Sequence, residues 1–202
     1  MSNILKAYNK DIKTQLNVLL DIVTNNKLIH EICRISQELD LKNYYIGAGF
    51  IAQSAWNYMS NYSLTHGIND IDIAYFDEDV SLEKEDQVIK KAEELFEDYP
   101  LKVDLKNQAR VHLWYKDHFG YEIKPYLSVE EAINTWPTTA TSIGIRLNQD
   151  NSWQIYAPFG LNDLLSKIIR ANRVQITKEI YEKKIERWIK YWSDLKIFPW
   201  EK

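Results

Sequence analysis

Hydrophobic residues along the chain follow two spacings, and each spacing predicts one type of secondary structure. Apolar side chains recur every three or four residues over positions 5–23 and again over 28–39. This spacing is typical of amphipathic helices. We therefore expect two helices near the start of the chain, separated by the Asn25-Asn26 pair. A further helix is expected over 82–98, which has the same spacing.

Short segments rich in β-branched and aromatic residues alternate with turn residues in the middle of the chain. Residues 44–46 predict a buried strand that ends at Gly47-Ala48-Gly49 and leads into a helix over 50–59. The other segments predicted to be strands are 71–76, 101–105, 111–115, 141–147 and 153–156. The last two are expected to form a hairpin, because the residues between them are typical of turns.

The pattern becomes helical again from residue 162 to about residue 192, with a break near 171–173. No repeat, low-complexity tract or long linker interrupts the chain. We therefore expect a single α+β domain over residues 1–202, with a mixed β-sheet flanked by helices. Its parts are N-terminal helices (1–40), a sheet-bearing core (41–160) and a C-terminal helical extension (161–202).

Composition and charge narrow the class of protein. The 202 residues are 45% hydrophobic and 27% charged, as in folded globular proteins. The formal net charge of −4 argues against a generic basic nucleic-acid coat protein, although residues 162–202 contain ten Lys/Arg and six Asp/Glu. Cys33 is the single cysteine, and no apolar run approaches the roughly 20 residues of a membrane helix. We expect a cytoplasmic protein with no membrane contact.

The Asp70-Ile71-Asp72 sequence carries the strongest chemical signal. Residues two apart on a strand project from the same face, so both carboxylates are expected to point one way while Ile71 points into the core. Neighbouring carboxylates repel one another unless a cation lies between them, and carboxylate oxygens suit Mg²⁺. A D-x-D sequence alone is weak evidence, because many surface strands contain one.

Two further features strengthen this hypothesis. Gly47 and Gly49 precede a helix, and glycines let a phosphate approach the backbone N–H groups at a helix N-terminus. Asp104 lies on a later strand, where alternation with Val103 and Leu105 directs it away from the core. Three carboxylates on neighbouring strands match a site for two metal ions, as used for phosphoryl transfer.

Taken together, these motifs resemble the DNA polymerase β-like nucleotidyltransferase superfamily, and more specifically a bacterial nucleotidyltransferase-like family. The matching stretches are GAGFIAQSAWN (47–57), DIDIAYFD (70–77), VDLKNQARVHLWY (103–115), TWPTTATSIGIRL (135–147), IYAPFGLNDLL (155–165) and IYEKKIERWIKYWSDLKIFPW (180–200). The resemblance implies a fold similar to the head domain of CCA-adding enzymes.

The resemblance also implies a role for each matching residue. Asp70 and Asp72 would hold two Mg²⁺ ions, and Asp104 would bind the catalytic ion and help to deprotonate an acceptor hydroxyl. Gly47 and Gly49 would cradle the phosphates of an NTP, and attack on the α-phosphorus would release pyrophosphate. The glycine segment departs from the family pattern, because it lacks a serine and precedes Asp70 by a longer interval than usual.

Several other residues have a structural and a functional interpretation. Arg110 is a candidate phosphate ligand, since a guanidinium group matches phosphate oxygens. For His112 and Lys106 we favour a structural and a solvated role, respectively. The aromatic stripe Tyr181, Ile185, Trp188 and Trp192 could stack bases, although core packing is the favoured interpretation.

Two functions from different classes follow from the sequence. The leading hypothesis is an Mg²⁺-dependent enzyme that moves an NMP from an NTP to a hydroxyl or phosphate of RNA, a protein or a small molecule. The alternative is a catalytically degenerate nucleotide-binding or regulatory module with the same fold. The sequence specifies neither the acceptor nor the oligomeric state.

Overall fold

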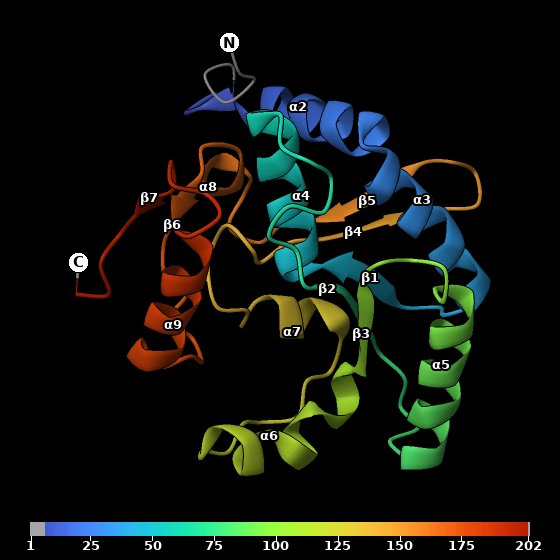
Figure 1. Cartoon of the computed structure of the whole chain (residues 1–202). Coiled ribbons are helices and arrows are strands. Elements are labelled where there is room, and N and C mark those ends of the chain that lie inside the picture. The colour runs from blue at the N-terminus through green and yellow to red at the C-terminus, as the bar shows by residue number, and fades with distance from the viewer. Residues whose placement is uncertain (1–6, 202) are drawn as a thin grey trace.

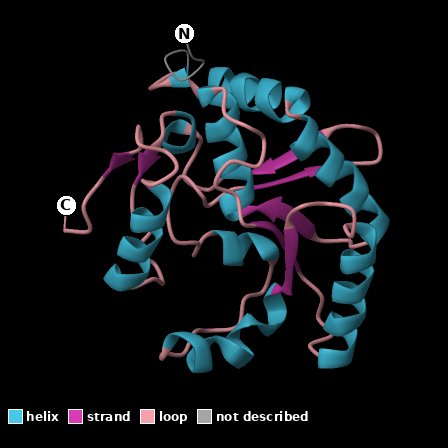
Figure 2. Ribbon diagram, viewed as in Figure 1, coloured by secondary structure: helices cyan, strands magenta, loops and turns pink. Residues whose placement is uncertain are grey.

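A computed structural model of the chain describes residues 7–201, in which helices surround a mixed β-sheet (Figure 1). Figure 2 shows the main sheet at the centre with helices around it, and a short pair of strands apart from it, near the C-terminus. This arrangement confirms the predicted α+β class. Within the described residues, no helix is both long and apolar enough to cross a membrane.

The N-terminal helices begin at side-chain caps. Helix α2 (Ile12–Asn25) begins after Asp11, whose side chain accepts a hydrogen bond from the Thr14 N–H. Helix α3 (Lys27–Ser36) begins after Asn26, whose side chain accepts from the Ile29 N–H, and η1 (Gln37–Leu39) continues it. Such caps satisfy N–H groups that a helix leaves unpaired. The predicted break at Asn25-Asn26 is thereby confirmed, whereas apolar position 5 lies outside the described residues.

Five strands form the main sheet, in the order β3-β2-β1-β4-β5. Their bounds are β1 Tyr44–Gly47, β2 Asp70–Tyr75, β3 Lys102–Asn107, β4 Gly144–Leu147 and β5 Trp153–Tyr156. Strands β2 and β3 are parallel and are connected by helix α5 (Leu82–Leu95), while the other neighbours are antiparallel. The sheet is therefore mixed, and the predicted hairpin is its β4–β5 pair.

The two faces of the sheet have different environments. Ile71, Ile73 and Tyr75 of β2 point into the main hydrophobic core. On the opposite face, Ala74 packs with residues of helix α7 (Val129–Ile133) in a smaller cluster. Since side chains alternate along a strand, Asp70 and Asp72 share the face of Ala74. The carboxylates thus lie on the less covered face.

A cluster of tryptophans fixes the C-terminal segment against helix α4 (Ala48–Ser60). The Trp56 ring of α4 lies 5.7 Å from the Trp188 ring and 5.4 Å from the Trp192 ring, edge to face in both cases. Trp188 is the last residue of helix α9 (Lys178–Trp188). These three side chains are almost completely buried, which confirms that the aromatic stripe belongs to the core.

One predicted strand is wrong. Residues 111–115 form the start of helix α6 (Val111–Phe119) instead, which follows the short η2 helix (Gln108–Arg110). Val111 and Tyr115 are both buried, and residues four apart share one face of a helix. The segment alternates over five residues but also fits helical spacing, and Gly120, with φ of 85°, ends it as a helix.

The predicted helical extension is also wrong in part. Helix α8 (Asn162–Leu165) stops after four residues, and Lys167 has a left-handed backbone with φ of 55°. The next residues form β6 (Ile168–Ile169), which pairs in parallel with β7 (Lys196–Ile197). Long-range strand pairing therefore overrides the local helical pattern here. Figure 1 shows α8, α9 and both short strands grouped on the flank of the sheet opposite α5.

Candidate functional site

Three carboxylates converge where β2 and β3 lie side by side. Asp72 is the register partner of Asp104 in the parallel β2–β3 pair, and Asp70 projects from the same face as Asp72. One carboxylate oxygen from each residue lies within 4.8 Å of the others, and all three residues are half-buried. Three converging oxygen donors fit a hard divalent cation.

Asp72 lies in an environment that disfavours its charged form. Burial, followed by the negative charges of Asp70 and Asp104, raises the pKa of Asp72 to about 7. The Phe50 N–H at the start of α4 donates to Asp72 Oδ2 at 3.2 Å and acts in the opposite direction. Without a cation, the cluster therefore tends to retain a proton at neutral pH, which a bound cation would displace.

The raised pKa of Asp72 predicts how the thermal stability of the protein changes with pH. A rise in pH should lower stability in EDTA but increase the stabilisation by a metal ion. A carboxyl whose pKa is raised on folding stabilises the protein fully below about pH 4, and this contribution disappears as the pH rises through about 7. We therefore expect the melting temperature in EDTA to fall more between about pH 5 and about pH 8 in the wild type than in Asp72→Asn. Stabilisation by added Mg²⁺ should instead grow over the same interval. An equal fall of the melting temperature in the two proteins over this pH interval would contradict this expectation.

The glycines predicted to bind phosphate have distinct surroundings. A Cβ on Gly47 would clash with the Ile143 carbonyl oxygen, so close packing against the neighbouring segment requires this glycine. A Cβ on Gly49 would lie 2.9 Å from Gln53 Nε2 and 3.5 Å from Asp72 Oδ2. Between them, Ala48 has a φ of 49°, a strained value of the kind found at functional sites. The glycine segment thus brings the α4 N-terminus close to Asp72.

Two lysines flank the carboxylates. Lys106 projects from the same face of β3 as Asp104 and forms an ion pair with it, so the predicted solvated role is incomplete. Lys184 of α9 is half-buried, and burial lowers its pKa while the charge of Asp72 opposes that effect. Lys184 was not predicted as a site residue, although it interrupts the aromatic stripe between Tyr181 and Trp188. A lysine on an apolar helix face is a signal that could have identified it.

A cavity of about 310 Å³ opens over Asp72 and Asp104. Lys106 and Lys184 also line it. Its other walls are rich in aromatic rings, which come from Trp114, Tyr115, Phe119, Tyr126 and Trp136. Sequence reasoning missed the rings of α6 because it assigned that segment to a strand. The cavity therefore combines acidic, cationic and aromatic groups.

Arg110 and His112 are not among the residues that line this cavity. The Arg110 Nε donates to Glu85 Oε2 at 2.7 Å, and its guanidinium group also donates to the Val80 carbonyl. Glu85 in turn accepts the Asn107 N–H, so this network connects the end of β3 to α5. Arg110 thus has a structural partner, and a phosphate role would require that pair to break.

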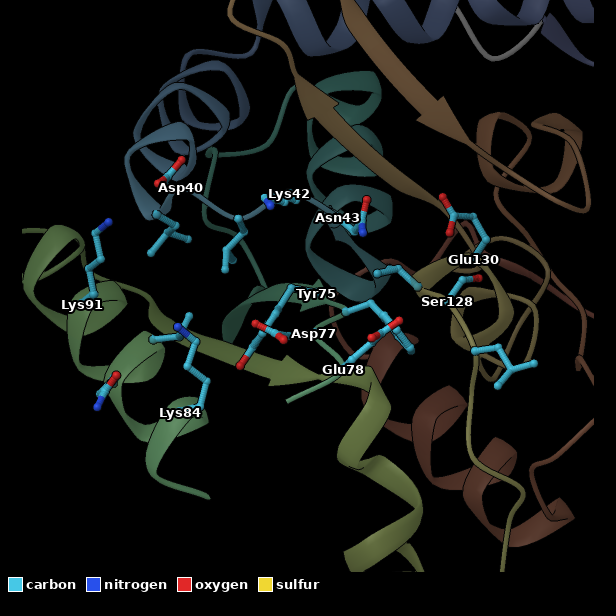
Figure 3. Close-up of a pocket in the computed structure, with 17 residues that line it drawn as sticks. Asp40, Lys42, Asn43, Tyr75, Asp77, Glu78, Lys84, Lys91, Ser128 and Glu130 are labelled. Atoms are coloured by element: carbon cyan, nitrogen blue, oxygen red, sulfur yellow. The ribbon is translucent and has the colours of Figure 1, made fainter. Parts of the chain in front are cut away.

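A second, larger cavity lies at the other end of β2, where Tyr75 and Asp77 contribute to it (Figure 3). Lys84 and Lys91 extend from α5 on one side of it, and Glu130 lies on the opposite side. Its volume is about 970 Å³, and it contains none of the three converging carboxylates. Since its charges are mixed and dispersed, size alone does not make it the metal centre.

Comparison with known proteins identifies the family. A family model described as nucleotidyltransferase matches residues 34–197. The chain belongs to this nucleotidyltransferase family. Its fold is similar to that of a protein solved by NMR, whose structure is described as revealing a CCA-adding enzyme head domain. The two share 28% sequence identity with a TM-score of 0.72, over 90% of this chain and 94% of the other.

No curated protein matches this nucleotidyltransferase chain. The family match confirms the predicted nucleotidyltransferase-like family, and the structural match confirms the predicted likeness to a CCA-adding enzyme head domain. The carboxylates of this nucleotidyltransferase are compatible with divalent metal ions.

Proposed function

We propose that this nucleotidyltransferase moves an NMP from an NTP to a hydroxyl or phosphate of an acceptor, with Asp70, Asp72 and Asp104 as ligands of two Mg²⁺ ions. The convergence of the three carboxylates, two of which line a cavity, carries this proposal. Bound Mg²⁺ would neutralise phosphate charge and polarise the reacting oxygens. The acceptor belongs to RNA, a protein or a small molecule.

The surroundings of the carboxylates supply a phosphate subsite. Helix α4 begins beside Asp72, and a helix N-terminus attracts anions through its N–H groups and dipole. Lys184 adds a positive charge from α9, and Lys106 adds another from β3. A Cβ on Gly49 would crowd Gln53, so the glycine keeps the backbone close to Asp72. These groups support binding of a triphosphate near the carboxylates.

The proposed reaction forms one P–O bond and breaks another. An acceptor oxygen attacks the α-phosphorus, and the bond between the α-phosphorus and the bridging oxygen breaks, releasing pyrophosphate. In this proposal the Asp104 carboxylate, which lines the cavity, takes the acceptor proton, the role that the resemblance to the superfamily implies for it. The Lys106 ammonium group would then exchange its partner, from the Asp104 carboxylate to a phosphate oxygen.

Removal of Lys184 is expected to weaken NTP binding. A charge-assisted hydrogen bond contributes about 1.5–3 kcal/mol, so Lys184→Ala should raise the Kd of Mg²⁺-NTP by roughly 10- to 100-fold. Lys184→Arg should restore most of the affinity. Lys183→Ala, at the exposed neighbouring position, is the matched control. Equal affinities for Lys184→Ala and Lys183→Ala would exclude a phosphate role for Lys184.

A non-catalytic nucleotide-binding module is the alternative, and one observation favours it. The ammonium group of Lys106 pairs with Asp104, so a side-chain cation lies beside the triad. In such a module, Lys106 would permanently replace a metal ion. NTP binding would then be independent of Mg²⁺, and no pyrophosphate would form.

Calorimetric titration of each NTP with and without Mg²⁺ tests the proposal directly. We expect Mg²⁺-dependent binding, followed by pyrophosphate release when RNA, protein or small hydroxyl acceptors are supplied. Binding that is unaffected by EDTA would favour the non-catalytic module. The absence of any NTP binding would reject both.

A further inference from the structure

We propose that an aromatic wall, formed by Trp114, Tyr115 and Phe119 of α6, holds the nucleobase of the bound NTP by ring stacking, with Trp114 as the main surface. The inference rests on the proposed function and specifies how its nucleotide substrate is recognised. All three rings line the cavity that contains Asp72 and Asp104. An aromatic surface beside a phosphate-binding centre suits a planar heteroaromatic ring.

The spacing of α6 places these rings on one side of the helix. Val111, Trp114, Tyr115 and Phe119 follow a three- and four-residue spacing and all line the cavity. Leu113 lies outside it and is 54% exposed. A single helix face therefore carries the aromatic wall.

The wall has a rigid support. Tyr115 is only 6% exposed and packs with Val111, Tyr126 and Ala132 in a separate hydrophobic cluster. Its hydroxyl lies 3.2 Å from that of Tyr121, and Tyr121 donates to the Gln175 carbonyl at 2.7 Å. Trp114 packs on this cluster but remains only partly buried. A partly exposed ring on a fixed support needs little ordering when a ligand stacks on it.

The cavity brings together the two kinds of group that suit a nucleotide. Ala48 marks the α4 N-terminus, and Asp72 and Asp104 follow as neighbours in the sheet. From Asp104 the chain passes through Lys106 and η2 into α6. A ligand with an anionic group over the carboxylates thus meets aromatic rings along the same cavity. An NTP has both parts.

Cavity size and polarity also agree with one ring system. The volume of about 310 Å³ is at the lower end of the range for ligand pockets, about 300–1,000 Å³. Two glutamines line the cavity: Gln108 Nε2 donates to the Lys106 carbonyl at 3.2 Å, and Gln175 Oε1 accepts from Tyr126 at 2.9 Å. Each amide has a second polar atom suited to a base edge.

The test compares an NTP with a ligand that has phosphates but no base. Mg²⁺-NTP and Mg²⁺-tripolyphosphate are titrated into wild type, Trp114→Ala, Trp114→Phe and the control Leu113→Ala. We expect Trp114→Ala to weaken NTP binding by roughly 5- to 100-fold and to leave tripolyphosphate binding unchanged. Trp114→Phe should lie between wild type and Trp114→Ala, and Leu113→Ala should match wild type. Phe119→Ala, at a residue 37% exposed, should weaken NTP binding without a folding defect.

The outcomes separate this inference from the proposed function. If Trp114→Ala and Phe119→Ala bind NTP as wild type does, the wall does not hold the nucleobase. If tripolyphosphate still binds with Mg²⁺ in that case, the proposed metal site is not contradicted. Equal losses for NTP and tripolyphosphate would also overturn the inference, because stacking acts on the base alone. If wild type binds neither ligand with Mg²⁺, the proposed function fails as well.

Discussion

Replacement of both Asp70 and Asp72 by asparagine is expected to abolish Mg²⁺-dependent NTP binding and to lower nucleotidyl transfer by at least about 1,000-fold. The two side chains are the β2 members of the converging triad, and an amide is a poor ligand for Mg²⁺ compared with a carboxylate. Asparagine keeps the shape of aspartate, and its Oδ1 can still accept the Phe50 N–H. The fold should therefore persist.

The same double variant should be more stable than wild type in EDTA. Burial and like-charge repulsion raise the pKa of Asp72, and the neutral amide removes both costs at neutral pH. Urea unfolding in EDTA and titration with Mg²⁺-NTP measure the two effects. Asp86→Asn changes an exposed carboxylate on α5 and should alter neither. Wild-type NTP affinity in the double variant would reject the triad as the metal centre.

Replacement of Trp192 by alanine is expected to lower the free energy of unfolding by about 3–5 kcal/mol. The Trp192 side chain is completely buried, and its ring packs against Trp56 of α4. Its Nε1 donates to Asn57 Oδ1 at 2.8 Å, so truncation also leaves a buried amide oxygen without this donor. Urea unfolding followed by circular dichroism measures the loss.

Trp192→Phe separates the two contributions. Phenylalanine keeps an aromatic ring but cannot donate to Asn57, so we expect a smaller loss than for alanine. Because Trp192 follows α9, Trp192→Ala should also weaken NTP binding by displacing Lys184. A loss below about 1 kcal/mol for Trp192→Ala would show that the tryptophan cluster does not anchor the C-terminal segment.

The arrangement of the carboxylates could be anticipated because it depends on one strand period and one parallel pair. The side-chain period of two places Asp70 and Asp72 on one face and Ile71 in the core, as the structure shows for Ile71. Asp104 was expected on a neighbouring strand, and β3 pairs with β2 so that Asp104 meets Asp72. Local periodicity was sufficient for the face on which each carboxylate lies, whereas the pairing of β2 with β3 is a long-range contact.

The aromatic wall could not be derived in the same way. Over five residues, alternation and helical spacing give equally good patterns, and residues 111–115 satisfy both. The deciding features lie outside the segment, in the η2 turn before it and in Gly120 after it. A strand would have placed Trp114 and Tyr115 on opposite faces, whereas the helix brings both to the cavity.

Lys184 illustrates a different limit. Its place over the carboxylates depends on how α9 packs, and that packing depends on Trp56 and Trp188, which are distant in sequence. The sequence indicated a buried aromatic stripe but not the surface that would cover it. The strand pairing of β6 with β7, which shortens α8, is equally non-local.

The order in which the cavity residues occur along the sequence has a consequence for protein synthesis. The ribosome makes the carboxylates on β2 and β3 first, then the aromatic wall, and Lys184 only with α9. A nascent chain can thus hold its acidic cluster, with Lys106 already paired to Asp104, before Lys184 has been translated. Messages that end prematurely between these points would yield polypeptides without Lys184 and without the tryptophans that cover α4. Such products would be incompletely packed substrates for cellular proteases.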